Sequence, residues 1–146
     1  MIKLYLDVCC LCRPFDDQNQ FIIRQEADSI QEILDRCHNS IILIGNEMID
    51  DEILRINHVH KRELVIRTTQ IIREYIHIDD NIKQRTMILR SYGFHAADAI
   101  HIACAEKAQA TFITTDKQIL QIAERNKHLL QYLIYHPTTW LMENIL

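Results

Sequence analysis

Short apolar runs alternate along the chain with longer stretches that have one apolar face. Residues 2–6 are mostly apolar and stop at Asp7, and residues 41–45 form a second apolar run that ends at Gly45. Between them, residues 19–36 place apolar side chains three and four positions apart, as in a helix with one buried face. The first third of the chain therefore predicts a strand, a helix and another strand.

The same alternation continues to the end of the chain. Asn46 follows the second run and is a suitable N-cap for a helix that reaches about residue 56. Pro137 suits the first turn of a final short helix. The remaining pattern predicts helices over residues 61–75, 81–91, 95–108 and 116–126, a short edge strand over 75–78, and strands over 111–114 and 130–135.

Apolar strands that alternate with helices indicate an α/β fold, a three-layer α/β/α sandwich with a central parallel sheet. With 146 residues and no linker or repeat, the chain is expected to form one domain over residues 1–146. Only two glycines and two prolines are present, which disfavours a many-turned β sandwich and excludes glycine-rich nucleotide loops. The 48% hydrophobic and 25% charged residues are typical of a globular protein rather than a disordered one.

The net charge of −4 argues against a protein that coats nucleic acid by charge alone. No apolar run is long enough for a membrane span, and Asp7 interrupts the first run before it can serve as a signal-peptide core, so we expect a cytoplasmic protein. Five cysteines, an odd number, do not form the even framework of a secreted disulfide protein. Reduced thiols are expected.

Four acidic residues follow or flank predicted strands. Asp7 and Asp116 come directly after two strands, Glu52 lies on the helix after the second strand, and Asp98 lies in the first turn of an alanine-rich helix. In a parallel sheet the carboxyl ends of the strands share one edge, where chemistry collects. Carboxylates brought together there repel one another, and a hard divalent cation, Mg²⁺ or Mn²⁺, relieves that repulsion.

Each acid also has a structural interpretation. Asp116 can be a helix N-cap, and Asp98 can complement the helix macrodipole. Glu52 shares its helix with Glu47, Asp50 and Asp51, and an acid on this helix can simply face solvent. Asp7 can form an Asx turn, although it stands between Leu6 and Val8, where an unpaired charge is costly.

Three motifs resemble the signatures of the PIN domain family, in the same order and spacing. They are LYLDVCCL at residues 4–11, ADAIHIA at 97–103 and FITTD at 112–116, and the likeness extends to HPTTWL at 136–141. PIN domains are metal-dependent ribonucleases and include the VapC-type toxins of toxin–antitoxin pairs. By this resemblance Asp7, Asp98 and Asp116 occupy the family's acidic positions. Glu52 best fits the fourth, with Glu47 as the alternative.

The resemblance implies hydrolysis of RNA phosphodiester bonds, with Mg²⁺ or Mn²⁺ held by the four acids and activating a water. It also implies a homodimer and an antitoxin that blocks the acids with a basic side chain; Trp140, Leu141 and Leu146 offer apolar surface for association or belong to the core. Flanking cations are needed to attract RNA or otherwise form solvated helix faces. The candidates are Arg55, His58, His60, Lys61, Arg62 and Arg67, with Lys83, Arg85 and Arg90 as a second patch.

The chain departs from the family pattern at two places. Val8 and Cys9 stand where many PIN domains have Thr-Asn, so a polar neighbour of the metal is missing and activity is expected to be weaker. Lys117, Gln118 and Ile119 replace a second acid after Asp116, which favours one metal ion over two. A catalytically weak or inactive PIN domain that binds a protein or RNA partner is therefore the main alternative.

Other chemistries fit the sequence less well. The C-x-x-C at residues 9–12 resembles a thioredoxin turn, but nothing else in the chain matches that family. A structural zinc site needs four ligands, and the other two cysteines are isolated. A haloacid-dehalogenase-type phosphatase needs a second Asp where Cys9 stands. The cysteines are expected to act as small apolar residues under the first strand.

Overall fold

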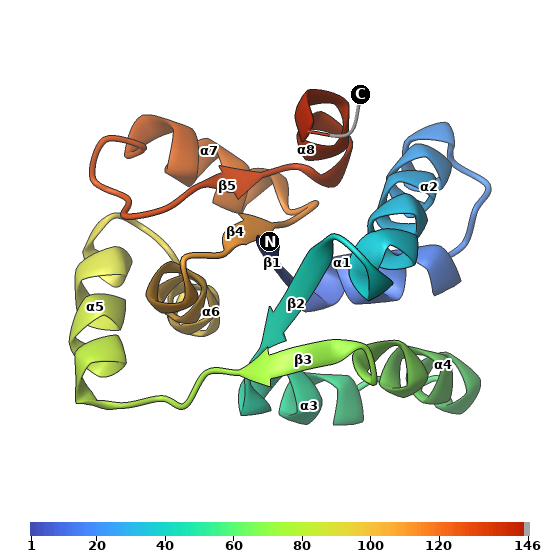
Figure 1. Ribbon diagram of the computed structural model, residues 1–146, viewed down its shortest axis with the longest axis horizontal. Coiled ribbons are helices and arrows are strands. Elements are labelled where there is room, and N and C mark those ends of the chain that lie inside the picture. Colours follow the sequence, from blue (N-terminus) through green and yellow to red (C-terminus); the bar gives the residue numbers. More distant parts are fainter. Residues whose placement is uncertain (145–146) are drawn as a thin grey trace.

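The computed structural model describes residues 1–144, which form a five-stranded sheet with helices on both faces (Figure 1). The strands are β1 (Ile2–Leu6), β2 (Ile41–Gly45), β3 (Ile72–Tyr75), β4 (Thr111–Ile113) and β5 (Ile134–Tyr135). Their order across the sheet is β3-β2-β1-β4-β5, and every neighbouring pair is parallel. The predicted three-layer α/β/α sandwich with a central parallel sheet is confirmed.

Helices connect the strands and cover the sheet. They are α1 (Val8–Cys12), α2 (Phe21–Asp35), α3 (Glu47–Leu54), α4 (Val59–Thr69), α5 (Asp80–Ser91), α6 (Ala96–Ala108), α7 (Lys117–Arg125) and α8 (Pro137–Asn144), with 3₁₀ turns η1 (Arg13–Phe15) and η2 (Arg36–His38). Helix α6 packs on β1, β2 and β4, with α5 outside it. Helices α2 and α8 pack together on the other side of the sheet (Figure 1).

The core is centred on β1, which lies between β2 and β4. Leu4, Tyr5 and Leu6 are almost completely buried, and the ring of Tyr5 packs on Phe112 of β4. Helix α6 contributes mainly alanines to the core, and their small side chains allow the helix to lie close to the sheet. Trp140 belongs to the core as well, whereas Leu146 lies outside the described residues.

Most predicted elements are present, but the prediction of a helix over residues 61–75 was wrong at its end. Helix α4 stops at Thr69 and β3 begins at Ile72, where Ile72 pairs with Leu43 of β2. The predicted strand over 75–78 therefore lies too late in the chain. Backbone pairing with β2 overrides the helical spacing of the side chains. The spacing could not reveal this pairing, because the pairing partner is distant in sequence.

Two further differences concern short segments. The strand predicted over residues 130–135 contracts to Ile134–Tyr135, and helix α1 was not predicted at all. A turn at residues 92–93 separates α5 from α6, and Gly93 has a φ of 113°, a conformation that residues other than glycine rarely adopt. Among residues 1–144, no helix combines the length and apolar character needed to cross a bilayer.

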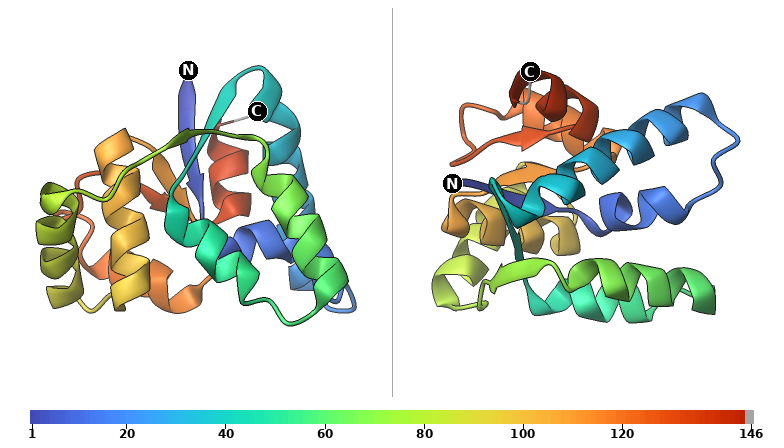
Figure 2. Two further views of the ribbon diagram at one scale, coloured as in Figure 1. Left: turned by 90° about the horizontal axis from the view of Figure 1, so that it is seen from below. Right: turned by 45° about the vertical axis from the view of Figure 1, so that its right-hand side comes forward.

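The parallel arrangement brings several chain reversals to one edge of the sheet. In the left view of Figure 2, β1 runs from the N-terminus toward the edge where α1 begins. Because β2 and β4 run parallel to β1, their carboxyl ends reach the same edge. The residues that follow these strands are therefore neighbours in space although they are distant in sequence.

Candidate functional site

Asp7 lies at the carboxyl end of β1 and is the N-cap residue of α1. Its backbone N–H donates to the carbonyl of Ile113, which ties the end of β1 to the end of β4. The side chain is only 9% exposed. Its Oδ2 accepts a hydrogen bond from the Thr114 hydroxyl at 2.7 Å and one from the Cys9 thiol at 3.3 Å. The carboxylate is thus held by neighbours from α1 and from the segment that follows β4.

Burial and the adjacent Cys9 raise the pKa of Asp7 to about 8, although the hydrogen bond from Thr114 opposes this shift. Thiol and carboxylate are close enough to titrate as a pair. Within residues 1–144, no Lys or Arg forms an ion pair with Asp7. The buried carboxylate therefore lacks a protein cation that would keep it ionised.

Asp7 and Asp116 both lie close enough to Asp98 to interact with it electrostatically. Burial, then the charges of Asp7 and Asp116, raise the pKa of Asp98 to about 6. Asp98 lies in the first turn of α6, as predicted. Asp116 is the N-cap of α7, and its Oδ1 accepts from the N–H groups of Gln118 and Ile119, so the structural interpretation of this residue is also correct.

Glu52 lies on α3 and makes a side-chain contact across the sheet edge. Its Oε1 is 2.6 Å from Nε2 of His101 on α6. Glu47, the alternative ligand, is exposed in the first turn of the same helix. We call Asp7, Glu52, Asp98 and Asp116 together the acidic rim.

Two residues near the acidic rim were not given a role by the sequence analysis. Thr114 is completely buried, and its hydroxyl donates to Asp7 while accepting the backbone N–H of Asp116. His101 is 2% exposed and lies within electrostatic range of both Asp7 and Asp98. His101 carried one sequence signal, a polar side chain three positions after Asp98 within the small and apolar run of residues 99–105.

The chemistry of the rim fits a hard divalent cation, because the donors are carboxylates and two of them have raised pKa values. A bound cation would offset the repulsion that raises the pKa of Asp98. Within residues 1–144, however, no three His, Cys, Asp or Glu side chains are positioned closely enough to hold a metal ion. The donor type fits, while the side chains do not form a closed coordination site.

The cysteines differ from one another in their surroundings, and none forms a disulfide. Cys10 is buried, as predicted for a small apolar residue. Cys9 is not such a residue: its sulfur contacts Asp7 and lies 3.6 Å from Thr114 Oγ1 and 3.2 Å from Thr115 Oγ1. The polar neighbour of Asp7 expected to be missing is therefore present, as a thiol together with the Thr114 hydroxyl.

Several of the proposed RNA-binding cations are engaged within the protein. Lys61 forms an ion pair with Asp16 at 2.5 Å, and Arg62 donates to the carbonyl of Ile56. In the second patch, Arg85 binds the buried Glu106 through two nitrogens. Arg55, His58 and His60 are exposed before and at the start of α4, and Arg67 is exposed in its last turn.

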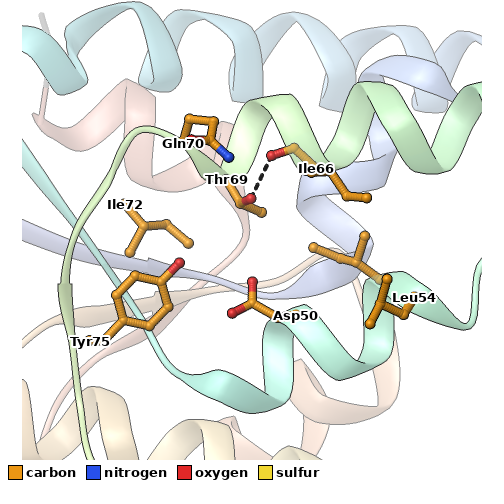
Figure 3. A pocket seen from close by; sticks show the side chains of 8 residues that line it. Asp50, Leu54, Ile66, Thr69, Gln70, Ile72 and Tyr75 are labelled. Carbon is orange, nitrogen blue, oxygen red and sulfur yellow. Dashed lines mark hydrogen bonds between the residues drawn. The ribbon is translucent and has the colours of Figure 1, made fainter.

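A separate groove lies between α3, α4 and β3 and has a volume of about 440 Å³. Figure 3 shows the Asp50 carboxylate beside Tyr75 and below Thr69, with apolar side chains on either side. Burial and the neighbouring acids Asp51 and Glu47 raise the pKa of Asp50. No residue of the acidic rim lines this groove, so the two features are distinct.

Comparison with known proteins gives a structural likeness only. No protein-family model matches the chain, and no curated protein matches it. A chain in the crystal structure of FitAcB from Neisseria gonorrhoeae superposes with a TM-score of 0.60, covering 92% of this chain and 97% of that chain. The two are 15% identical, so the likeness shows a shared PIN-like fold and nothing finer.

Proposed function

We propose that this protein is a Mg²⁺- or Mn²⁺-dependent ribonuclease, the toxin of a toxin–antitoxin pair. The observation that carries the proposal is the effect of Asp7 and Asp116 on Asp98, whose pKa they help to raise to about 6. Carboxylates that repel one another without a protein cation favour an external one. The PIN-like fold and the three sequence motifs support the same function.

A metal bound to these carboxylates would activate a water and stabilise negative charge on the phosphoryl oxygens. The residues of the chain have separate tasks in this proposal. Asp7 and Asp98 hold the cation, Asp116 adds a further carboxylate, and Thr114 orients Asp7 through its hydrogen bond. The exposed cations near α4 attract the RNA backbone.

The binding test is a calorimetric titration with Mn²⁺ of the wild type, Asp7→Asn and Asp98→Asn. Each substitution removes a charge with little change in volume. We expect the wild type to bind and both variants to bind at least tenfold more weakly. Asp28→Asn, on the exposed face of α2, is the matched control and should bind like the wild type. Equal binding by all four proteins, or by none, would refute the metal site.

The activity test follows from the same set of variants. Wild-type protein with Mn²⁺ is expected to cleave a mixture of cellular RNAs, and chelation of the metal is expected to stop cleavage. Metal binding without cleavage would favour the second candidate function, a PIN-like domain that binds a partner without catalysis. The observation behind that candidate is the absence, within residues 1–144, of three preassembled metal-binding side chains.

The proposed partners follow from the PIN resemblance. An antitoxin would place a basic side chain against the acidic rim, and two copies of the chain would form a homodimer. Sedimentation at micromolar concentration tests the dimer, and a purely monomeric profile would exclude it under those conditions. Loss of Mn²⁺ binding on addition of the antitoxin would test the blocking mode.

A further inference from the structure

Three side chains form a hydrogen-bonded chain from the core to the acidic rim. Tyr5 Oη on β1 lies 2.6 Å from Nδ1 of His101 on α6, and Nε2 of His101 lies 2.6 Å from Oε1 of Glu52 on α3. Tyr5 and His101 are buried, whereas the Glu52 side chain is 25% exposed. Glu52 is therefore the end of this hydrogen-bonded chain that solvent or a ligand can reach.

The chemistry of the two ends fixes the direction of these hydrogen bonds. An ionised carboxylate only accepts, so Nε2 of His101 carries the hydrogen that is donated to Glu52. With a neutral ring, Nδ1 is then an acceptor and takes the hydroxyl hydrogen of Tyr5. Tyr5 thus selects the ring tautomer that can hold Glu52.

Glu52 is distinguished from the other acids of α3 by this contact. Glu47, Asp50 and Asp51 are exposed, and within residues 1–144 none of them forms an ion pair or hydrogen bond through its side chain. His101 also lies within electrostatic range of Asp7 and Asp98. One buried ring therefore contacts Glu52 and lies near two other acids of the rim.

We infer that His101 is a positioning residue: its Nε2–H group holds the Glu52 carboxylate at the acidic rim, and the Tyr5 hydroxyl fixes the ring tautomer that does so. One carboxylate oxygen of Glu52 is occupied by His101, which leaves the other for a cation. The long glutamate side chain then loses its rotamer freedom on folding rather than on binding. The consequence for metal binding rests on the proposed function, whereas the hydrogen-bonded chain does not.

Tyr5→Phe is the decisive variant, because it removes one hydroxyl without touching any acid of the rim. We expect its affinity for Mn²⁺ to fall about tenfold, the lower end of the loss seen when a partner of a metal ligand is removed. Tyr92→Phe is the matched control, because it removes a tyrosine hydroxyl that is not part of the hydrogen-bonded chain. Its affinity for Mn²⁺ is expected to be unchanged. An unchanged affinity in folded Tyr5→Phe would overturn the role of Tyr5.

Nitrogen NMR of the His101 ring tests the hydrogen-bonded chain in the absence of any metal. The wild type should show the Nε2–H tautomer, and Tyr5→Phe and Glu52→Gln should each shift the ring toward a mixture of tautomers. A wild-type ring protonated mainly at Nδ1 would refute the inference. If the wild type binds no Mn²⁺ but shows the expected tautomers, the proposed function fails while the positioning of Glu52 stands.

Discussion

Two groups of carboxylates lie near α1, and only one of them is paired with basic side chains of the protein. In the first, which we call the ion-pair network, Asp16 and Glu26 are matched by basic side chains from several segments of the chain. Arg13 lies 3.1 Å from Asp16 and 3.2 Å from Glu26, Lys61 pairs with Asp16, and His136 lies 2.6 Å from Glu26. In the acidic rim, Asp7 and Asp98 face other acids instead.

This difference separates a structural role from a functional one. The ion-pair network joins η1, α2, α4 and the turn before α8, so its charges are used to hold segments together. The rim leaves its charge without a protein cation, which costs stability unless something binds. Acids retained at such a cost favour a role in binding a cation.

Breaking the ion-pair network should have the largest effect. Arg13→Met keeps most of the side-chain volume but leaves Glu26, which is 8% exposed, without its guanidinium partner. We expect the free energy of unfolding to fall by about 3 kcal/mol, because Glu26 keeps only the His136 ring as a partner while Asp16 and Thr115 also lose their hydrogen bonds from the guanidinium. Urea unfolding measures this change.

Arg36→Met is the matched control for that variant. It breaks the Arg36–Glu32 pair on the surface of α2, where both side chains are more than 40% exposed. The expected loss is about 0.5 kcal/mol. Equal losses in the two variants would mean that the network contributes no more than an exposed pair.

A smaller loss in the free energy of unfolding is expected when the hydrogen bond from Thr114 to Asp7 is removed. Thr114→Val retains the shape of a completely buried side chain but removes the hydroxyl that donates to Asp7. We expect a loss of about 2 kcal/mol, since Asp7 and the N–H of Asp116 both lose a partner. Thermal or urea unfolding tests this, and Thr68→Val on α4 provides a partly buried control. A change below that of the control would show that Asp7 does not depend on Thr114.

The smallest effect, and one of opposite sign, is expected for Asp98→Asn. The folded protein raises the pKa of Asp98 from 3.8 to about 6, so between these values the folded state binds the proton more tightly than the unfolded state. The stability of the wild type therefore falls as pH rises from about 4 to about 6, and this loss persists at higher pH. After allowance for partial exposure, we expect Asp98→Asn to be about 1 kcal/mol more stable than wild type at pH 7, with no gain at pH 3.5.

Unfolding curves at the two pH values measure that difference. Asp28→Asn again serves as the control and should show no pH-dependent gain. A destabilised Asp98→Asn at pH 7 would mean that the carboxylate has a favourable partner in the folded protein. The prediction would then fail, and Asp98 would resemble the acids of the ion-pair network.

The sequence determined those features that depend on local pattern. Apolar runs and helical spacing located β1, β2, α5 and α6 with errors of one residue or none, because the side chains that decide these elements are near neighbours in the chain. The acids after β1 and β4 could be placed at one edge because parallel strands share their carboxyl ends. The N-cap roles of Asn46 and Asp116 were also predictable from position.

The tertiary structure decided the features that depend on distant partners. Pairing with β2 set the start of β3, although the local spacing continued the preceding helix. Tyr5, His101 and Glu52 are 96 and 49 positions apart along their two hydrogen bonds, so no local pattern connects them. The pairing of Arg13 with Glu26 is of the same kind. Local sequence fixes which groups a segment carries, whereas only the packed fold fixes which charges meet a partner and which do not.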